Sequence, residues 1–535
     1  MGLVPTELNK DSVLIFLVGL AIFTFHLAPE FIGFQTHFAL FAQEMLRNGA
    51  TFFPTTYGTP YPDYPATATF LIYLVSMLLG AVTPFSAVLP TAVTSALILV
   101  VTYRIAAIRS RQWGLAAVLF ALFTVEFFFM SRSIALDQYV SLAALLSFYL
   151  AYSADCYHRY KRLRLVPLIW IAGFSFRGPI GLVLPVAVVC CYYLCNASFK
   201  QLILTGAVGG MTLALCMAGL LAAAKAQAGE SFMETVLIAQ MTGRVHDGGG
   251  SSARYWLGCL SSYAVSCPVA IVVVGARFKN ILRRKTDDDK LLCGLASWIV
   301  IVLVGMSIPA TKHTRYVLPI VPALSLVAAY LLVDSSPKGI LFATRKTFVA
   351  SCSFLPLLGT IATLGILSFG NYFGFTADVH FVIALALLIA LSIIAATLNK
   401  RLKGYPNHDM AFVAVGVAAF IIVSAGVVQP INASLESTRP FVEKVKLLQK
   451  ELPGDLVFYQ IGPDAEDIKF MANYDKPIMP IFVKSPDELL KCRKNSYFIA
   501  KKQSFDYLPE DVKRRIQLRF EGRIGHRDCV VFTNL

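Results

Sequence analysis

Charged and polar side chains that could do chemistry stand in this sequence between long apolar segments. A charge at the centre of a bilayer costs about 2 to 3 kcal/mol, so each of them needs a compensating role. They occur in six short segments: Glu30, Gln35 and His37; Asp63; Arg132 and Asp137; Arg177; Arg244, His246 and Asp247; and Lys312, His313 and Arg315. If these segments converge on one membrane face, carboxylates and cations together could hold an anionic lipid head group beside an acid or base.

Several of these residues also have a simpler interpretation. Glu44 and Arg47, in the first of these segments, fit the solvated face of an interfacial helix, and a lone histidine such as His37 fits a packing position. Asp63 stands between prolines and could shape a turn. His246 and Asp247 precede three glycines and could form a loop tip instead of holding a metal. The chain has no zinc-ligand spacing and no GxxxxGK[ST] loop, so it predicts neither a zinc site nor ATP-driven transport by this chain alone.

The composition decides the class of protein. The 535 residues are 56% hydrophobic and only 15% charged, with a mean hydropathy of +0.65. These values indicate a polytopic membrane protein and exclude a water-soluble enzyme, a secreted disulfide scaffold and a disordered interaction protein. The net charge of +15 could suggest nucleic-acid binding. The basic residues, however, are scattered over short loops, which argues against a nucleic-acid partner.

Hydropathy predicts about thirteen transmembrane helices. They lie near 12–30, 87–107, 113–131, 138–153, 165–176, 178–196, 201–224, 254–276, 291–308, 316–334, 347–369, 378–398 and 411–429. The fifth and sixth are interpreted as one pair broken at Arg177-Gly178-Pro179. The apolar stretch 66–83 is interpreted as a segment that does not span the membrane.

The distribution of lysine and arginine sets the predicted orientation. With the N-terminus cytoplasmic, most basic residues before residue 430 fall in inner loops, including the run 277–290 (RFKNILRRKTDDDK). All the chemistry-bearing segments then face the outer side. The first apolar stretch is too long for a cleavable signal and is expected to act as an anchor.

The predicted organisation has two domains. Residues 1–429 form a transmembrane domain with outer loops at 30–86 and 225–253. Residues 430–535 have soluble composition and alternate helix-like and strand-like runs, which predicts a small periplasmic α/β domain. Two cysteines in that domain, Cys492 and Cys529, could pair in an oxidising compartment, and the sequence leaves this open.

Five motifs in a fixed order carry a family resemblance. They are FALFAQEMLRNG, PTTYGTPYPDYP, SRSIALDQY, FRGPIGLVLP and KHTRYVLPIVP, spread over about residues 10–335. In this order they resemble the GT-C membrane glycosyltransferases of the protein O-mannosyltransferase superfamily, and most of all the aminoarabinose transferases that modify lipid A. The resemblance implies a sugar donor on a polyprenyl phosphate that is attacked on the outer face by an acceptor hydroxyl or phosphate.

The resemblance also implies roles for single residues. Asp137 matches the family's second acidic position, and Arg177 stands where many members have Lys before Gly-Pro. Arg244 and Tyr316 match positions that contact the lipid phosphate. This chain departs from the family pattern in two places: the acidic pair of the first loop is replaced by Phe34-Gln35, and the Lys after the proline-rich loop is replaced by Tyr64.

These observations predict an inverting membrane glycosyltransferase of the bacterial inner membrane. It would move one sugar from a polyprenyl-phosphate donor to lipid A or another envelope glycolipid. The alternatives are a protein O-glycosyltransferase, a lipid-linked sugar carrier or flippase, and an inactive binding subunit. A carrier should place charges along mid-membrane helices, whereas this chain places them at one interface. No cofactor is expected, with a divalent metal left open.

The predicted site residues fall into three groups. Asp137 and Glu30 are the candidate catalytic carboxylates; Glu30 lies one helical turn before Phe34 and could equally anchor the end of the first helix. The groups expected to bind the donor phosphate are Arg177, Arg244, Arg315, Tyr316 and Lys312. The residues expected to bind substrate are Gln35, His37, Asp63, Tyr64 and His313.

Overall fold

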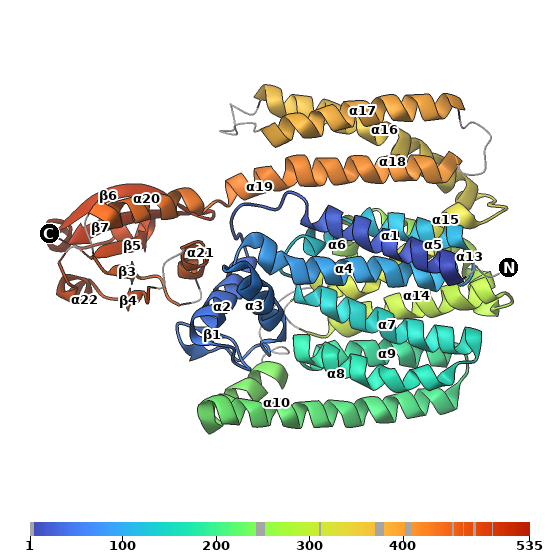
Figure 1. Ribbon diagram of the computed structural model, residues 1–535, viewed down its shortest axis with the longest axis horizontal. Coiled ribbons are helices and arrows are strands. Elements are labelled where there is room, and N and C mark those ends of the chain that lie inside the picture. The colour runs from blue at the N-terminus through green and yellow to red at the C-terminus, as the bar shows by residue number, and fades with distance from the viewer. Residues whose placement is uncertain are drawn as a thin grey trace. The chain divides into compact units, whose positions relative to one another are not determined.

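The computed structural model shows a chain that is mostly helical, with one mixed β-sheet near its C-terminal end (Figure 1). It describes residues 5–241, 252–309, 312–369, 379–401, 408–451, 454–463, 465–474, 478–494 and 496–534. Contacts divide the chain into two compact units. We call Met1–His26, Tyr61–Ala68 and Val88–Val427 the helical unit, and Leu27–Pro60, Thr69–Ala87 and Val428–Leu535 the mixed unit.

Long apolar helices build the helical unit. In chain order its helices are α1 (Pro5–Thr24), most of α4 (Pro84–Ala107), α5 (Arg111–Leu122), α6 (Val125–Ser131), α7 (Leu136–Tyr157), α8 (Val166–Arg177), α9 (Pro179–Cys195), α10 (Phe199–Met241), α12 (Ser252–Ser262), α13 (Ser266–Arg283), α14 (Asp287–Ser307), α15 (Val321–Val333), α16 (Ile340–Phe369), α17 (Val379–Arg401) and α18 (His408–Val423). Short 3₁₀ segments, η1 (Tyr160–Leu165) and η2 (Thr314–Ile320), precede α8 and α15, and a π-helical turn, η4 (Ser424–Val428), follows α18.

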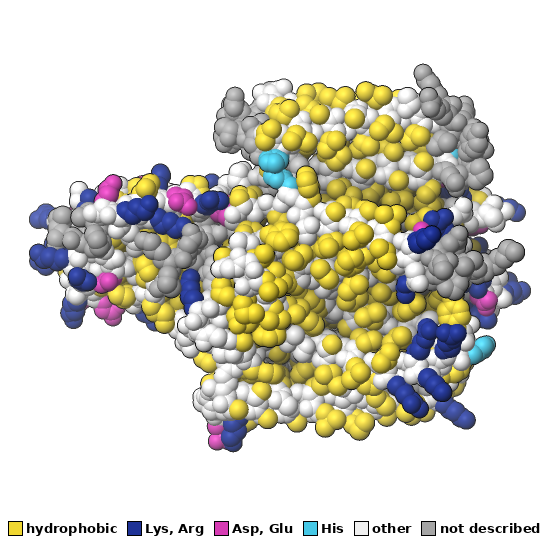
Figure 2. All heavy atoms as spheres, in the orientation of Figure 1, with side chains coloured by type: hydrophobic (Ala, Val, Ile, Leu, Met, Phe, Trp, Pro, Cys, Tyr) yellow, Lys and Arg dark blue, Asp and Glu magenta, His cyan; other side chains and the backbone are white. Residues whose placement is uncertain are grey.

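The predicted multi-span helical architecture is confirmed. Within the described residues, eight helices are long and apolar enough to cross a membrane, or ten if each of two bent helix pairs counts as one span. One bent pair is α5 with α6, which meet at 75° within the predicted span 113–131. Hydrophobic side chains cover the flank of the helical unit seen in Figure 2, whereas lysines and arginines gather toward one end of it. This surface pattern is the one that a bilayer favours.

The stretch 66–83 forms one short helix. This helix, α3 (Thr67–Leu79), has 13 residues, whereas crossing the hydrocarbon core takes about 20 residues. Its length agrees with the interpretation of this stretch as a segment that does not span the membrane.

Helices α7, α8, α9 and α10 run side by side (Figure 1) and pack on one another. The backbones of α8 and α9 approach so closely that a Cβ on Gly181 would lie 2.0 Å from the Gly173 carbonyl oxygen. Two glycines facing each other are therefore what lets this helical hairpin close. Its turn is Gly178, at a φ of +64°, a left-handed conformation that a residue with a Cβ adopts only with strain. The hairpin fixes the position of Arg177, the last residue of α8.

A five-stranded sheet forms the centre of the mixed unit, with strand order β4-β3-β5-β7-β6. Strands β4, β3 and β5 are parallel to one another, and β7 and β6 are antiparallel to their neighbours. The strands are β3 (Leu456–Tyr459), β4 (Ile481–Val483), β5 (Tyr497–Lys501), β6 (Ile516–Ile524) and β7 (Arg527–Asn534). The helices between and before them are α19 (Gln429–Leu435), α20 (Arg439–Glu451), α21 (Glu466–Ala472), α22 (Pro486–Lys491), α23 (Lys502–Asp506) and α24 (Glu510–Lys513).

Residues from the first loop of the chain complete this unit. Helix α2 (Gln35–Asn48) packs on α21 and contributes Leu40 to the core on one face of the sheet. A two-stranded hairpin, β1 (Thr55–Thr56) and β2 (Thr59–Pro60), follows α2. Cys492 and Cys529 are not bonded to each other, and burial raises the pKa of the Cys529 thiol to about 12. The contacts thus group the loop 27–60 with residues 428–535, an association that the sequence did not predict.

Candidate functional site

A buried ion pair joins two of the predicted site residues. Asp137 is the second residue of α7, and Arg177 ends α8. The Nε atom of Arg177 lies 3.3 Å from Oδ1 of Asp137, and each side chain is only 8% exposed. A buried charge pair in an apolar bundle is stable only when its partners stay together. The helical unit therefore holds a fixed cation and a fixed carboxylate at the turn between α8 and α9.

Two tyrosine rings enclose the Arg177 guanidinium. Its central carbon lies 4.9 Å from the ring centroid of Tyr64 and 4.9 Å from that of Tyr316. Both distances are within the range of cation–π attraction. Tyr64, which stands where the resembled family has a lysine, thus contributes the face of its ring to a cation that α8 supplies. The structure brings four predicted site residues together here: Tyr64, Asp137, Arg177 and Tyr316.

Gln240 of α10 borders this cluster. Its Nε2 atom donates a hydrogen bond to the Asp63 carbonyl, 2.5 Å away, which ties the proline-rich loop to α10. Its Oε1 atom is buried and has no hydrogen-bond partner among the described residues. A Cβ built on Gly178 would lie 2.7 Å from this oxygen. Gln240 therefore touches both sequence segments that flank the Arg177 guanidinium.

The segment that carries Tyr316 and Arg315 is held from two sides. Thr314 donates its hydroxyl to Oε1 of Glu126 at 3.3 Å, and the Tyr263 hydroxyl donates to the Thr314 carbonyl at 2.6 Å. The Arg315 guanidinium lies 5.6 Å from the Tyr316 ring. These contacts position a second cation on η2, next to the ring that covers Arg177.

His313 and Lys312 directly precede η2. The His313 ring lies 5.2 Å from that of Tyr316, edge to face. Partial burial lowers the pKa of His313 below its ordinary value, and the nearby charges of Arg315 and Arg177 act in the same direction. This direction favours the neutral imidazole, which can accept a hydrogen bond, although the charge of Asp137 acts the other way.

The remaining predicted residues lie elsewhere. Glu30 belongs to the mixed unit, where its carboxylate accepts hydrogen bonds from the Ser437 hydroxyl and from the backbone N–H groups of Thr438 and Arg439, at 2.5, 2.8 and 2.9 Å. These donors stand at the start of α20, so the carboxylate occupies the positive end of that helix. Gln35 and His37 lie in the first turn of α2 in the same unit.

The interpretation of Glu44 as a solvated residue is wrong. Its side chain is buried, and its carboxylate accepts hydrogen bonds from the Thr55 hydroxyl and from the backbone of Tyr57 and Gly58. A carboxylate that accepts hydrogen bonds from the β1–β2 hairpin satisfies several backbone donors at once, which explains its burial.

Arg132 has a structural role. It donates to the carbonyls at the end of α1, including those of Phe25 and His26.

Arg244, His246 and Asp247 lie outside the described residues. Among the residues that are described, no group of three His, Cys, Asp or Glu side chains is arranged to hold a metal ion.

Sequence reasoning missed two residues of this region. Glu126 is the only acidic residue in the apolar run 113–131, and this isolation was a usable signal, since a carboxylate in an apolar helix needs a partner. Gln240 carries no comparable signal, because an uncharged amide near the end of a long helix is unremarkable in sequence.

No protein-family model matches the chain. An undecaprenyl phosphate-alpha-4-amino-4-deoxy-L-arabinose arabinosyl transferase from Pectobacterium carotovorum is 25% identical over 345 residues, which are 63% of this chain and 60% of that protein. A protein of the same name from Yersinia pestis is 25% identical over 311 residues, 56% of this chain and 55% of the relative. The chain thus matches between half and two thirds of the length of these curated relatives.

Solved structures extend the comparison to the whole chain. ArnT from Cupriavidus metallidurans bound to undecaprenyl phosphate superposes with a TM-score of 0.71 over 99% of this chain and 98% of that protein, at 14% identity. The same protein in the apo state gives a TM-score of 0.72. This chain has the fold of ArnT. The resemblance to aminoarabinose transferases, first seen in five motifs, is confirmed.

Proposed function

We propose that this protein is an integral membrane glycosyltransferase that moves a sugar from a polyprenyl-phosphate donor to lipid A or another envelope glycolipid. The observation that carries the proposal is the Arg177–Asp137 pair enclosed by Tyr64 and Tyr316. The fold shared with ArnT and the relatives named as arabinosyl transferases support it.

The arrangement suits a phosphate leaving group. Glycosyl transfer from a polyprenyl phosphate releases an anion, and fixed cations stabilise such an anion without reorganisation. The ion pair to Asp137 uses Nε of Arg177, so a phosphate would engage the two terminal nitrogens in a bidentate contact. Arg315 would supply the second charge, and Arg244 and Lys312 remain predicted partners of the same phosphate.

Asp137 is the proposed catalytic carboxylate. One of its oxygens faces Arg177, and the other would accept a proton from an acceptor hydroxyl. An acceptor phosphate is already anionic and mainly needs positioning, which makes the absence of the family's first-loop acidic pair tolerable. Because its oxygens are engaged at the start of α20, we propose that Glu30 is structural.

Three further features belong to the proposal. Tyr64, Asp63 and His313 are the proposed substrate-binding residues, and Gln35 and His37, which belong to the mixed unit, stay sequence predictions. The protein is proposed to lie in the bacterial inner membrane with about thirteen spans, a cytoplasmic N-terminus and the domain 430–535 in the periplasm. No cofactor is proposed for the reaction, since a lipid phosphate needs no nucleotide-bound metal to leave, and a divalent metal stays open as an addition.

Lipid analysis of cells with and without the gene tests this function. Mass spectrometry of envelope lipids should show a glycolipid that carries one added sugar only when the wild-type gene is present, and the mass of the addition identifies the sugar class. Folded Arg177→Ala protein should not make that product, while Arg159→Ala, an exposed arginine before η1, should keep it. An unchanged lipid profile with modified proteins would make this a protein glycosyltransferase, and no modified product of either kind would favour a carrier.

A further inference from the structure

A second polar site lies at the other end of α7. It is a cavity of about 510 Å³ where α7 and α9 end and α14 begins, lined by residues that include Tyr152, Asp155, Tyr192 and Lys290. Asp155 stands 18 residues after Asp137 on the same helix, which is about 27 Å at 1.5 Å per residue. That distance is close to the hydrocarbon thickness of a bilayer, about 30 Å. The cavity is therefore separate from the site at Arg177.

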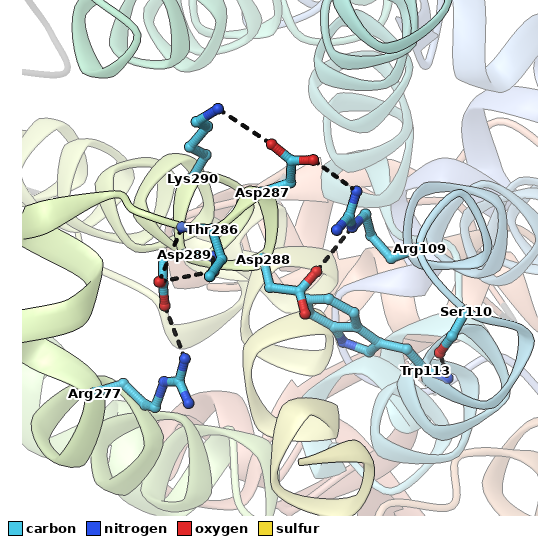
Figure 3. A network of polar contacts seen from close by, with 9 residues as sticks. All are labelled: Arg109, Ser110, Trp113, Arg277, Thr286, Asp287, Asp288, Asp289 and Lys290. Atoms are coloured by element: carbon cyan, nitrogen blue, oxygen red, sulfur yellow. Dashed lines mark hydrogen bonds and ion pairs between the residues drawn. The ribbon is translucent and has the colours of Figure 1, made fainter. Parts of the chain in front are cut away.

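The cations beside this cavity are already neutralised (Figure 3). Arg109 contacts Asp288 through Nε at 2.8 Å and Asp287 through a terminal nitrogen at 3.2 Å. Lys290 lies 3.1 Å from the other oxygen of Asp287. Two cations thus balance two carboxylates. The network fixes the start of α14 to the turn after α4 and leaves little positive charge for an anionic ligand.

Asp155 is the carboxylate that this network does not balance. One of its oxygens accepts the Tyr192 hydroxyl at 2.8 Å. Within the described residues, no lysine or arginine forms an ion pair with it, and the exposed His158 is the nearby group that could add positive charge. A ligand that neutralises Asp155 would therefore have to carry a positive charge.

The surroundings of Asp155 also favour a cation. Tyr152 and Tyr192 stand perpendicular, with ring centroids 6.5 Å apart, and Tyr157 adds a third ring to the lining. Aromatic faces beside a carboxylate attract an ammonium group. Helices α7 and α9 both end at this cavity, and the C-terminal end of a helix carries partial negative charge.

We propose that this cavity binds the ammonium head group of an amine-bearing phospholipid in the leaflet at this end of the bundle. A membrane lipid fits better than a soluble amine because the elements that border the cavity carry exposed apolar side chains: Tyr157, which lines it, is 50% exposed, and Leu194, in the last turn of α9, is 54% exposed. Acyl chains would lie along this flank. The ammonium group would sit against Asp155 and the tyrosine rings, and the lipid phosphate would remain in solvent.

The test measures lipid retention by the full-length protein. The protein is reconstituted in nanodiscs that contain equal amounts of phosphatidylethanolamine and phosphatidylglycerol, released into the gas phase, and its bound lipids are counted by native mass spectrometry. Wild-type protein should retain phosphatidylethanolamine at least tenfold over phosphatidylglycerol. Asp155→Asn should lower that preference about tenfold, and Glu230→Gln, which removes an exposed carboxylate on α10, should not change it.

A competition experiment and a fallback measurement complete the test. Soluble phosphoethanolamine, added in excess, should fail to displace the lipid, and full displacement would assign the site to a soluble amine instead. Should Asp155→Asn not fold, the wild-type lipid preference still decides, because equal retention of both lipids overturns the proposal. Full preference in folded Asp155→Asn protein overturns it as well.

Discussion

Arg177 and Asp137 come from different helices and meet through the Nε atom of the guanidinium, 3.3 Å from the carboxylate. Neither side chain is more than 8% exposed. The geometry matters because this contact uses Nε, so the carboxylate orients the guanidinium through one nitrogen. One residue thus receives its orientation from a carboxylate and its packing from two tyrosine rings.

Replacing Arg177 by Lys should separate charge from geometry. Lysine keeps the positive charge but loses the planar fork that contacts a carboxylate and a phosphate together. We expect kcat/KM for sugar transfer to fall by roughly tenfold to a hundredfold, as for the loss of a bidentate charged contact. Arg159→Lys, at an exposed position, is the matched control. Transfer at the wild-type rate in Arg177→Lys protein would show that a point charge is sufficient.

Tyr64 should act through its ring and not through its hydroxyl. The ring centroid lies 4.9 Å from the Arg177 guanidinium. Tyr64→Phe preserves this contact and should bind donor almost normally, whereas Tyr64→Ala should weaken donor binding by about 1 to 2 kcal/mol, the range of a desolvated cation–π contact. Titration with polyprenyl phosphate measures both variants. Equal loss in the two would instead assign the role to the hydroxyl.

Gly178→Ala should destabilise the α8–α9 hairpin. The residue has a φ of +64°, and the new Cβ would lie 2.7 Å from Oε1 of Gln240. We expect a loss of about 1 to 3 kcal/mol, seen as a lower thermal unfolding midpoint in detergent. In Gly210→Ala, on α10, the new Cβ meets nothing within 4 Å, so stability should hold or rise. A similar midpoint for both variants would contradict the strain at Gly178.

Glu30→Gln should affect stability and leave the chemistry intact. The carboxylate receives three hydrogen bonds at the start of α20, and an amide oxygen accepts them less strongly. A loss of roughly 1 to 3 kcal/mol of unfolding free energy is expected, as for a buried charged hydrogen-bond acceptor. Glu443→Gln, whose side chain is 53% exposed, serves as the control. If folded Glu30→Gln protein has full stability but no transfer, the residue is catalytic after all.

The sequence predicted the parts of this molecule that local patterns encode. Apolar runs predicted the long helices, charged residues at their ends pointed to Asp137 and Arg177, and the family resemblance added Tyr316. Local patterns do not encode which distant segments pack together. Glu30 is bonded to residues more than 400 positions later, and nothing near residue 30 signals this contact. Glu30 was therefore assigned to the site, although its hydrogen bonds lie within the mixed unit.

The most direct test of the account is sugar transfer by the purified protein in a membrane. Wild-type protein in proteoliposomes receives a polyprenyl-phosphate sugar and lipid A, and the products are identified by mass spectrometry. The account predicts singly glycosylated lipid A and free polyprenyl phosphate from wild-type protein, and neither product from Asp137→Asn or Arg177→Ala protein that keeps its wild-type unfolding midpoint. Full transfer by both folded variants would contradict the assignment of the reaction to the Arg177–Asp137 pair.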